Sequence, residues 1–307
     1  MIENPALTQK IKDIIENLCP MPAEISFAVI NLKTETPEIS GFNMDKFIYP
    51  ASVYKVFIGA EVLRQIHEKK LRLDEIIEIK SPNDVDKSYR LFPRLTTDDG
   101  RPLLVAGDKV TIDYLLDLMF SRSDNTASNT LIDLVTRESM NDNIILPNNW
   151  QGSEITRKFL GRVKEDEKYR HLDITLTCAR HLVELFYKIE INKLENEWVS
   201  MKLKVYMHRW IRSGRGGLNL PEFKDYYRKG GWLEVNHYKI NILGAIRNIW
   251  KRGHAINRWS NDVGVVTTED CHYVVALLTL TKTKWPWVSF PLKKFSKKVL
   301  EVMRGVR

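Results

Sequence analysis

The sequence predicts a mixed α/β fold in which strands at both ends of the chain build a sheet and a helical region lies between them. Segments rich in β-formers or with alternating apolar residues occur near both ends, and apolar residues recur at helical spacing in the middle. Strands that flank a run of helices favour a sheet-containing part, residues 1–50 and 213–307, and a mainly helical part, residues 51–212. The predicted strands are residues 25–30, 38–43, 226–233, 262–267 and 273–280.

The composition is that of one globular unit. Of the 307 residues, 43% are hydrophobic and 28% are charged, which is ordinary for a chain that buries a core. No linker rich in Gly, Ser or Pro separates two halves, so we expect interleaved parts of a single unit, 1–307, that acts as a monomer. The net charge of +8 favours anionic partners. Because no nucleic-acid motif accompanies the scattered basic residues, no nucleic-acid partner is expected.

Local patterns predict the N-terminal elements. Apolar residues at helical spacing within residues 7–18 indicate an amphipathic helix that docks through one face. Residues 25–30 then predict a strand, and residues 38–43 are expected to pair with it across the turn-like segment 33–37.

A helix is predicted after Pro50, because apolar residues from Val56 onward keep a helical period. This places Ser52 in its first turn and Lys55 one turn inside, on the same face. A serine hydroxyl has little nucleophilic strength of its own, and an adjacent amine can take its proton. Burial and a nearby Lys229 are expected to lower the pKa of Lys55 toward the range of a useful base.

Helices fill the middle of the chain, and a further helix closes it. Residues 81–108 lack a helical period and predict a long polar loop. The expected helices are residues 111–120, 126–136, 175–189, 194–211 and 291–303.

Two further motifs add polar groups to this serine and lysine. Ser-Asp-Asn at 123–125 supplies a hydroxyl and a carboxamide, and Lys-Gly-Gly at 229–231 supplies a cation on a strand with no Cβ beside it. Taken singly, each has a simpler interpretation. Ser123 or Asp124 caps the helix that follows, and Lys-Gly-Gly forms a turn. Together with the Ser-x-x-Lys motif, however, the set fits acyl transfer from an anionic amide.

Cysteine usage indicates chemistry without a metal or another cofactor. The cysteines, at 19, 178 and 271, are odd in number and far apart, so neither a disulfide framework nor a zinc site is indicated. A single disulfide is left open. No stretch has the length and hydropathy of a membrane span, and residues 1–18 carry charges throughout and lack the apolar run of a signal peptide.

The three motifs, in this order, resemble those of the penicillin-recognising serine enzymes, and especially of class A β-lactamases, whose signature is Ser-x-x-Lys, Ser-Asp-Asn and Lys-Thr-Gly. The similarity includes Tyr-Pro-Ala at 49–51, Leu-Pro at 220–221 and residues 261–266, and spans roughly residues 10–303. The resemblance implies a β-lactamase/transpeptidase-like fold: an antiparallel sheet flanked by helices, an all-helical subdomain, and an active site in the cleft between them. It also implies acyl-serine chemistry on β-lactams or D-Ala-D-Ala peptides.

By this resemblance, each motif residue has a role. Ser52 attacks the carbonyl carbon, Lys55 is the base, and Ser123 relays a proton to the leaving nitrogen with electrostatic support from Lys229. Asn125 bonds both the substrate and Lys55. The remaining substrate-binding residues implied are Gly230, Gly231 and Trp232, the last of which forms an oxyanion hole of backbone N–H groups with Ser52.

One departure from the family pattern concerns deacylation. Class A β-lactamases carry a Glu in a loop between the second and third motifs, where it activates the deacylating water. Aligning residues 155–157 with the start of that loop puts Gly161 and Arg162 at its place. The carboxylates nearby have the wrong spacing, and residues 164–170 are expected to form a solvated charge run. Those carboxylates are Glu154, Glu165, Asp166 and Glu167.

Two other departures concern substrate binding. Gly230 stands where Thr or Ser is usual, so a hydroxyl that binds the substrate carboxylate is missing. The segment between Lys229 and Asn261 is longer than a hairpin needs and predicts an active-site flap. Arg258 is expected to bind a substrate carboxylate bidentately from that flap.

Three functions fit these residues. The first is a serine hydrolase that acts on β-lactams and releases its acyl group slowly, because the deacylating Glu is missing. The second is a D-Ala-D-Ala peptidase or an amidase-esterase that acts on small peptides or esters. The third is a sensor that stays acylated, or a pseudoenzyme that only binds a ligand. Family habit places such proteins in the periplasm or outside the cell, whereas the lack of a signal peptide in this chain leaves the cytoplasm open.

Overall fold

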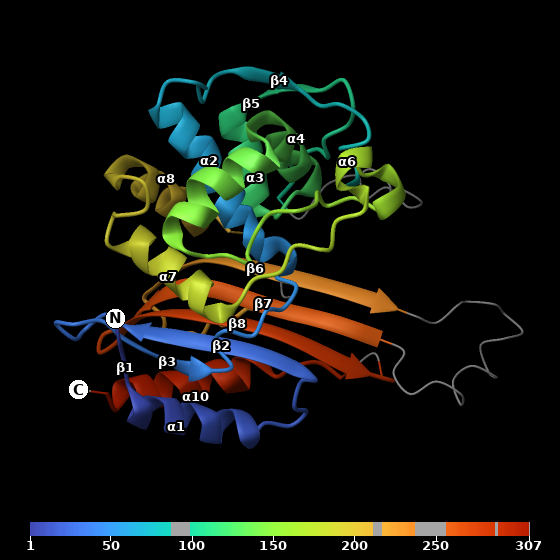
Figure 1. Cartoon of the computed structure of the whole chain (residues 1–307). Coiled ribbons are helices and arrows are strands. Elements are labelled where there is room, and N and C mark those ends of the chain that lie inside the picture. The colour runs from blue at the N-terminus through green and yellow to red at the C-terminus, as the bar shows by residue number, and fades with distance from the viewer. Residues whose placement is uncertain (87–98, 211–216, 237–255, 286–287, 307) are drawn as a thin grey trace, which may run out of the picture.

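The computed structural model describes residues 1–86, 99–210, 217–236, 256–285 and 288–306. At its centre is a six-stranded sheet with helices on both faces (Figure 1). Its strands are β1 (Ile2–Glu3), β2 (Glu24–Asn31), β3 (Glu38–Phe42), β6 (Asp225–Asn236), β7 (Ile256–Thr267) and β8 (His272–Thr283). The helices are α1 (Pro5–Glu16), α2 (Lys55–His67), α3 (Ile112–Ser121), α4 (Asn125–Val135), α5 (Arg137–Met140), α6 (Glu167–Arg170), α7 (Ala179–Glu190), α8 (Glu197–His208) and α10 (Leu292–Arg304).

The strand order β1-β3-β2-β8-β7-β6 joins the two ends of the chain in one sheet. β2 pairs antiparallel with β3 on one side and with β8 on the other, and β8, β7 and β6 continue the antiparallel pattern. β6 is therefore an edge strand. A separate small hairpin, β4 (Ile76–Glu78) with β5 (Lys109–Thr111), lies in the helical region.

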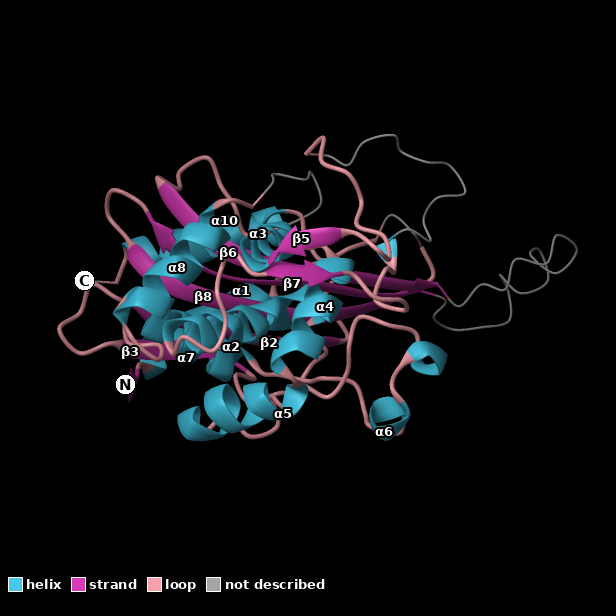
Figure 2. Ribbon diagram, turned by 90° about the horizontal axis from the view of Figure 1, so that it is seen from above, coloured by secondary structure: helices cyan, strands magenta, loops and turns pink. Residues whose placement is uncertain are grey.

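Both faces of the sheet are covered, which explains why β2 is a nearly continuous apolar run. α1 and α10 pack on one face, where the rings of Phe27 and Phe295 meet edge to face at 4.9 Å. α2, α7 and α8 lie over the other face (Figure 2). Among the described residues, no helix is long and apolar enough to cross a membrane.

Most of the elements predicted from local patterns are confirmed, and the differences are at their ends. α7 begins at Ala179, four residues later than expected from 175, because the backbone of Thr177 pairs with that of Ile48. β7 begins at Ile256, six residues before the predicted start at 262. The prediction missed this part of the strand because its residues are mostly polar and show no apolar alternation. Residue 211, at the end of one predicted helix, lies outside the described residues. The proposed boundaries between sheet and helical parts stay a prediction.

Candidate active site

Ser52 lies in a 3-10 turn, Ala51–Tyr54, and not in the first turn of α2 as expected. α2 follows without a break at Lys55, so the chain still coils through one turn between Ser52 and Lys55. Ala51 has a φ of 48°, in the left-handed region that a residue with a Cβ rarely adopts. Such strain is typical of functional turns, where the surrounding structure fixes an unfavourable conformation.

Lys55 is fully buried, at 0% exposure, and its amine is held by the second motif. Nζ donates to the backbone oxygen of Ser123 at 2.7 Å and to Asn125 Oδ1 at 2.8 Å. Burial lowers the pKa of Lys55 to about 7, while the carboxylates of Asp86 and Asp124 act in the opposite direction. The expected lowering of the Lys55 pKa is therefore present, and burial is its main cause.

The Ser123 hydroxyl lies between two amines. It accepts from Lys55 Nζ at 3.2 Å and from Lys229 Nζ at 2.9 Å. Ser123 has a φ of 60°, a second strained residue in this site. The simpler capping interpretation applies to Asp124, whose side chain accepts from Ala127 N at 2.8 Å at the start of α4. The capping prediction is thus confirmed for Asp124, while the catalytic role implied for Ser123 stays a prediction.

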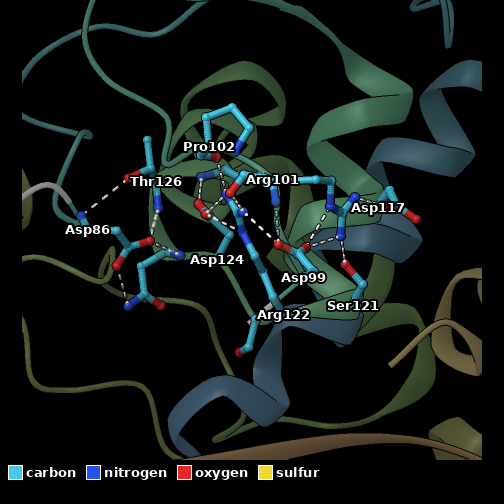
Figure 3. A network of polar contacts seen from close by, with 12 residues as sticks. Asp86, Asp99, Arg101, Pro102, Asp117, Ser121, Arg122, Asp124 and Thr126 are labelled. Atoms are coloured by element: carbon cyan, nitrogen blue, oxygen red, sulfur yellow. Dashed lines mark hydrogen bonds and ion pairs between the residues drawn. The ribbon is translucent and has the colours of Figure 1, made fainter. Parts of the chain in front are cut away.

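Asp124 is held in place by a network of charged side chains (Figure 3). Arg122 donates to Asp124 Oδ2 through Nη2 at 2.9 Å and forms an ion pair with Asp99. Arg101 links Asp99 to the side chain of Asp117 on α3. This network braces the turn at 123–125 through the bonds of Arg122 to Asp124 and Asp99.

Lys229 projects from β6 into the same cluster. Its side chain is 3% exposed, and Nζ also donates to the backbone oxygen of Gly230 at 2.9 Å. Burial, and then the positive charges of Lys55 and Arg228, hold the pKa of Lys229 well below its usual range. Two amines that share one hydroxyl disfavour each other's protonation, so this cluster can hold a neutral amine near neutral pH.

Gly231 lets β6 approach the turn that carries Ser52. A Cβ at this position would lie 2.4 Å from Pro50 O and 2.8 Å from Ser52 N, both backbone atoms that cannot move aside. The glycine is thus required by close contact of two backbones. Trp232 follows on the edge strand with its side chain 48% exposed.

Gly230 has a different reason to lack a side chain. A Cβ there would lie 2.1 Å from Arg228 Nη2, so the guanidinium of Arg228 already fills that space. Arg228 Nε donates to the buried carboxylate of Asp262 at 2.7 Å, and the guanidinium lies 5.0 Å from the ring of Trp210. A buried cation therefore occupies the space that a side chain at position 230 would need.

Arg258 lies apart from this cluster. It belongs to β7, opposite Glu234 of β6, and is 7% exposed, so the expectation that it lies on a flap is wrong. Its binding of a substrate carboxylate stays a prediction. Its guanidinium donates to Glu234 Oε2 at 3.0 Å through Nε and to the backbone oxygen of Val288. The first residues of β7 are mostly polar, so the sequence predicted a flap where this strand begins. Residues 237–255 of the predicted flap lie outside the described residues.

The loop between the second and third motifs presents an aromatic ring to Lys55. The ring of Phe159 stacks on Tyr54 at 4.5 Å, and Lys55 Nζ lies 4.3 Å from its centroid. The alignment with the family puts Gly161 and Arg162 at the place of the deacylating Glu and gives no signal for Phe159, because a lone Phe carries no motif. The loop thus presents an apolar face to Lys55.

Residues 164–170 were expected to form a solvated charge run, but Glu165 is buried, at 2% exposure. The expectation is wrong for this residue. Its carboxylate accepts from Arg137 Nη2 at 2.5 Å and from the backbone N–H of Lys158 at 2.9 Å. Both oxygens are thereby engaged in holding the loop against α5. This makes Glu165 a structural residue of the loop.

Glu165→Gln is expected to lower the free energy of unfolding by roughly 1–3 kcal/mol, because it deprives the buried Arg137 of its anionic partner. Lys168→Ala is the control. The Lys168–Glu138 pair is exposed, so its loss is expected to cost about 0–1 kcal/mol. Urea unfolding of the variants measures both values. A Glu165→Gln protein of unchanged stability that no longer releases an acyl group would instead identify Glu165 as the water-activating base.

The sheet, the helical region and the Ser–Lys pair define the β-lactamase-like class of serine proteins. A sequence model of the beta-lactamase enzyme family matches residues 6–298, so the chain belongs to that family. No curated protein matches the chain.

Solved structures of similar fold cover nearly the whole chain. A beta-lactamase from Sphaerobacter thermophilus is 17% identical with a TM-score of 0.68, and the alignment covers 97% of each chain. The TLA-3 extended-spectrum beta-lactamase is 16% identical with a TM-score of 0.70, covering 97% of this chain and 98% of the other. PBP-A is 17% identical with a TM-score of 0.65, covering 99% and 95%. These likenesses establish the fold.

Proposed function

We propose that the protein is a serine hydrolase that forms an acyl-serine intermediate on Ser52 with β-lactams or related amides and releases it slowly. One observation carries the proposal. The amine of Lys55, one helical turn from Ser52, is fully buried, and its pKa is lowered to about 7. A lysine in this range is neutral often enough at neutral pH to accept the serine proton.

The chemical steps follow from the positions of the polar groups. Ser52 Oγ bonds to the carbonyl carbon, and its proton passes to the neutral amine of Lys55. The C–N bond then breaks, and the leaving nitrogen receives a proton through the Ser123 hydroxyl, which both amines contact. Backbone N–H groups of Ser52 and Trp232 are the oxyanion donors that the resemblance implies. The hydrogen bonds of Lys55 Nζ among the described residues go to Ser123, Asp124 and Asn125, so the transfer requires that the Ser52 hydroxyl comes within reach of this amine.

The positive charges around the cluster favour an anionic substrate. Lys229 Nζ lies beside the Ser123 hydroxyl, whereas the guanidinium of Arg228 beside Gly230 is already paired with the buried Asp262. A substrate carboxylate next to Lys229 would favour the protonated form of its amine. Carboxylates pair well with such donors, which supports β-lactams and peptides with a free carboxylate as substrates. A solved PBP-A variant is an acyl-enzyme complex with penicillin G, which is consistent with this substrate class for the fold.

Slow release of the acyl group is supported by the loop that faces Lys55. It presents the Phe159 ring, and the Glu165 carboxylate is bound to Arg137. A general base must reach the water that it activates. Because this loop offers no carboxylate at Lys55 within the described residues, hydrolysis of the acyl-enzyme is expected to be its slow step.

The experiment is intact mass spectrometry of the protein after incubation with a penicillin and, separately, with a D-Ala-D-Ala peptide and a small ester. We compare the wild type with Ser52→Ala and follow the product in time. An adduct on the wild type alone, formed fastest with the penicillin and lost over minutes to hours with product, is the expected result.

Other outcomes assign other functions. Faster turnover of the peptide or the ester indicates a peptidase or an amidase-esterase on the same site. A permanent adduct indicates a sensor. Absence of any adduct on a folded protein would contradict acyl-serine chemistry and leave a ligand-binding pseudoenzyme.

A further inference from the structure

Asp86 contacts the second motif from a segment that sequence analysis assigned to a polar loop. Its Oδ2 accepts from the backbone N–H of Asn125 at 2.8 Å and of Thr126 at 3.3 Å. The backbone N–H of Asp86 donates in turn to the Thr126 hydroxyl at 3.4 Å. Figure 3 shows Asp86 facing Thr126, on the side of the motif opposite to Arg122. The start of α4 is therefore held from both sides.

Asp86 also fixes which way the Asn125 carboxamide points. Asn125 Nδ2 donates to Asp86 Oδ1 at 3.4 Å, and Asn125 Oδ1 accepts from Lys55 Nζ at 2.8 Å. A flipped carboxamide would put its oxygen against a carboxylate and its NH₂ against an amine. The contact with Asp86 would then be repulsive and a protonated Lys55 would lose its acceptor, so the two neighbours favour the observed orientation.

The carboxylate acts on Lys55 through charge as well. Two carboxylates, Asp86 and Asp124, raise the Lys55 pKa against the effect of burial, and the effect of Asp86 is the larger. Burial and Asp124 raise the pKa of Asp86, and Lys55 lowers it, so the two groups respond to each other. Lys229, from β6, faces Lys55 across the Ser123 hydroxyl, and the loop contributes only the uncharged Phe159 ring.

We propose that Asp86 is a positioning residue for the acylating lysine, fixing the Asn125 carboxamide against Lys55 and setting by its charge the pH range in which Lys55 works as a base. The acylating role of Lys55 rests on the proposed function, whereas the coupling between Asp86 and Lys55 does not.

Asp86→Asn tests the proposal with little change of shape, because the new side chain keeps one oxygen for the backbone N–H groups and loses the charge. Asp117→Asn is the matched control. Asp117 belongs to the neighbouring network, bonds Arg101 and Arg209, and has no contact with Lys55. Protein labelled with [¹³Cε]lysine gives the titration midpoint of Lys55 directly by NMR, and Lys55→Arg assigns its signal.

The Lys55 midpoint is expected to fall by about one unit in Asp86→Asn, at the low end of the effect of a neighbouring opposite charge. Asp117→Asn is expected to leave it unchanged. Adduct formation by Asp86→Asn should then persist to lower pH than in the wild type, while its plateau rate falls severalfold because the Asn125 carboxamide is no longer fixed. Asp86→Glu, which restores the charge, should return the midpoint toward the wild-type value.

An unchanged midpoint in a folded Asp86→Asn protein overturns the proposal, and so does an equal shift in Asp117→Asn. If Asp86→Asn does not fold, Asp86→Glu decides: a wild-type midpoint with a reduced plateau supports the positioning role, and no change in either quantity overturns it. A shifted midpoint in a protein that no penicillin, peptide or ester acylates means that the proposed function has failed, not the coupling.

Discussion

Lys55→Ala is expected to slow acylation of Ser52 by about 10²–10⁴-fold, the usual contribution of a general base. Nζ is the amine closest in sequence to the nucleophile, and hydrogen bonds from it to Ser123 and Asn125 fix its position. Alanine removes the base and leaves these acceptors without their donor. The rate at which the adduct appears, followed by mass spectrometry in the wild type and the variant, measures the effect. A rate within tenfold of the wild type would contradict the assignment of Lys55 as the base.

The same amine predicts how acylation depends on pH. Lys55 must be neutral to accept a proton, and its pKa is about 7. Acylation of the wild type should therefore rise through pH 7 and, well below it, fall by about tenfold per pH unit. This limb should be absent from Lys55→Ala. Its persistence there would assign the titration to Lys229, which contacts the same Ser123 hydroxyl. Lys168→Ala, at an exposed lysine, is the control and should keep the wild-type profile.

The sequence predicted those parts of the fold that depend on local periodicity. α1, β2 and β3 form where apolar spacing placed them, because each buries a single face or lies within the sheet. The start of α2 and the length of β7 escaped prediction. The first depends on a strained turn at Ala51, and the second on backbone pairing of polar residues with β6. Neither leaves a trace in the hydrophobic pattern.

The candidate site divides in the same way. Lys55, Ser123, Asn125 and Lys229 carry motifs, and the structure joins their side chains by hydrogen bonds that run from Lys229 to Ser123, Lys55 and Asn125 in turn. The other contributors, Asp86, Phe159 and Arg228, carry none. Asp86 and Phe159 contact the motifs from segments that are distant in sequence, and the guanidinium of Arg228 fills the space beside Gly230. Only the packing of the folded chain shows these relations.

Arg228 explains why residue 230 has no side chain. The sequence alone shows only that Gly230 stands where Thr or Ser is usual. In the structure, the guanidinium of Arg228 fills the space of that side chain and is bound to the buried Asp262. Gly217, with a φ of 122°, lies on the other side of the guanidinium, where a Cβ would come 2.6 Å from Nη1. Two glycines thus make room for one buried cation near Lys229, whose pKa it helps to lower.

Gly231→Ala is the other substitution from which we expect a large effect. The new methyl would lie 2.4 Å from Pro50 O and 3.0 Å from Val53 N, so β6 or the turn that carries Ser52 must shift. Overpacking of this kind typically costs about 1–3 kcal/mol of stability. Movement of the turn by even 1 Å also displaces the nucleophile, which can cost about 10²-fold in rate. Urea unfolding and the rate of adduct formation measure the two effects in one variant.

Gly161→Ala is the matched control, since it adds the same methyl to the same type of residue. A Cβ at Gly161 meets no atom within 4 Å, and its φ of −65° suits any residue. Its stability should be unchanged or higher by about 0.4–1 kcal/mol, because alanine restricts the unfolded chain, and its acylation rate should equal that of the wild type. If Gly231→Ala behaved like Gly161→Ala in both measurements, β6 would not need to contact the Ser52 turn so closely. The oxyanion hole of Ser52 and Trp232 N–H groups that the resemblance implies would then lose the support of this close contact.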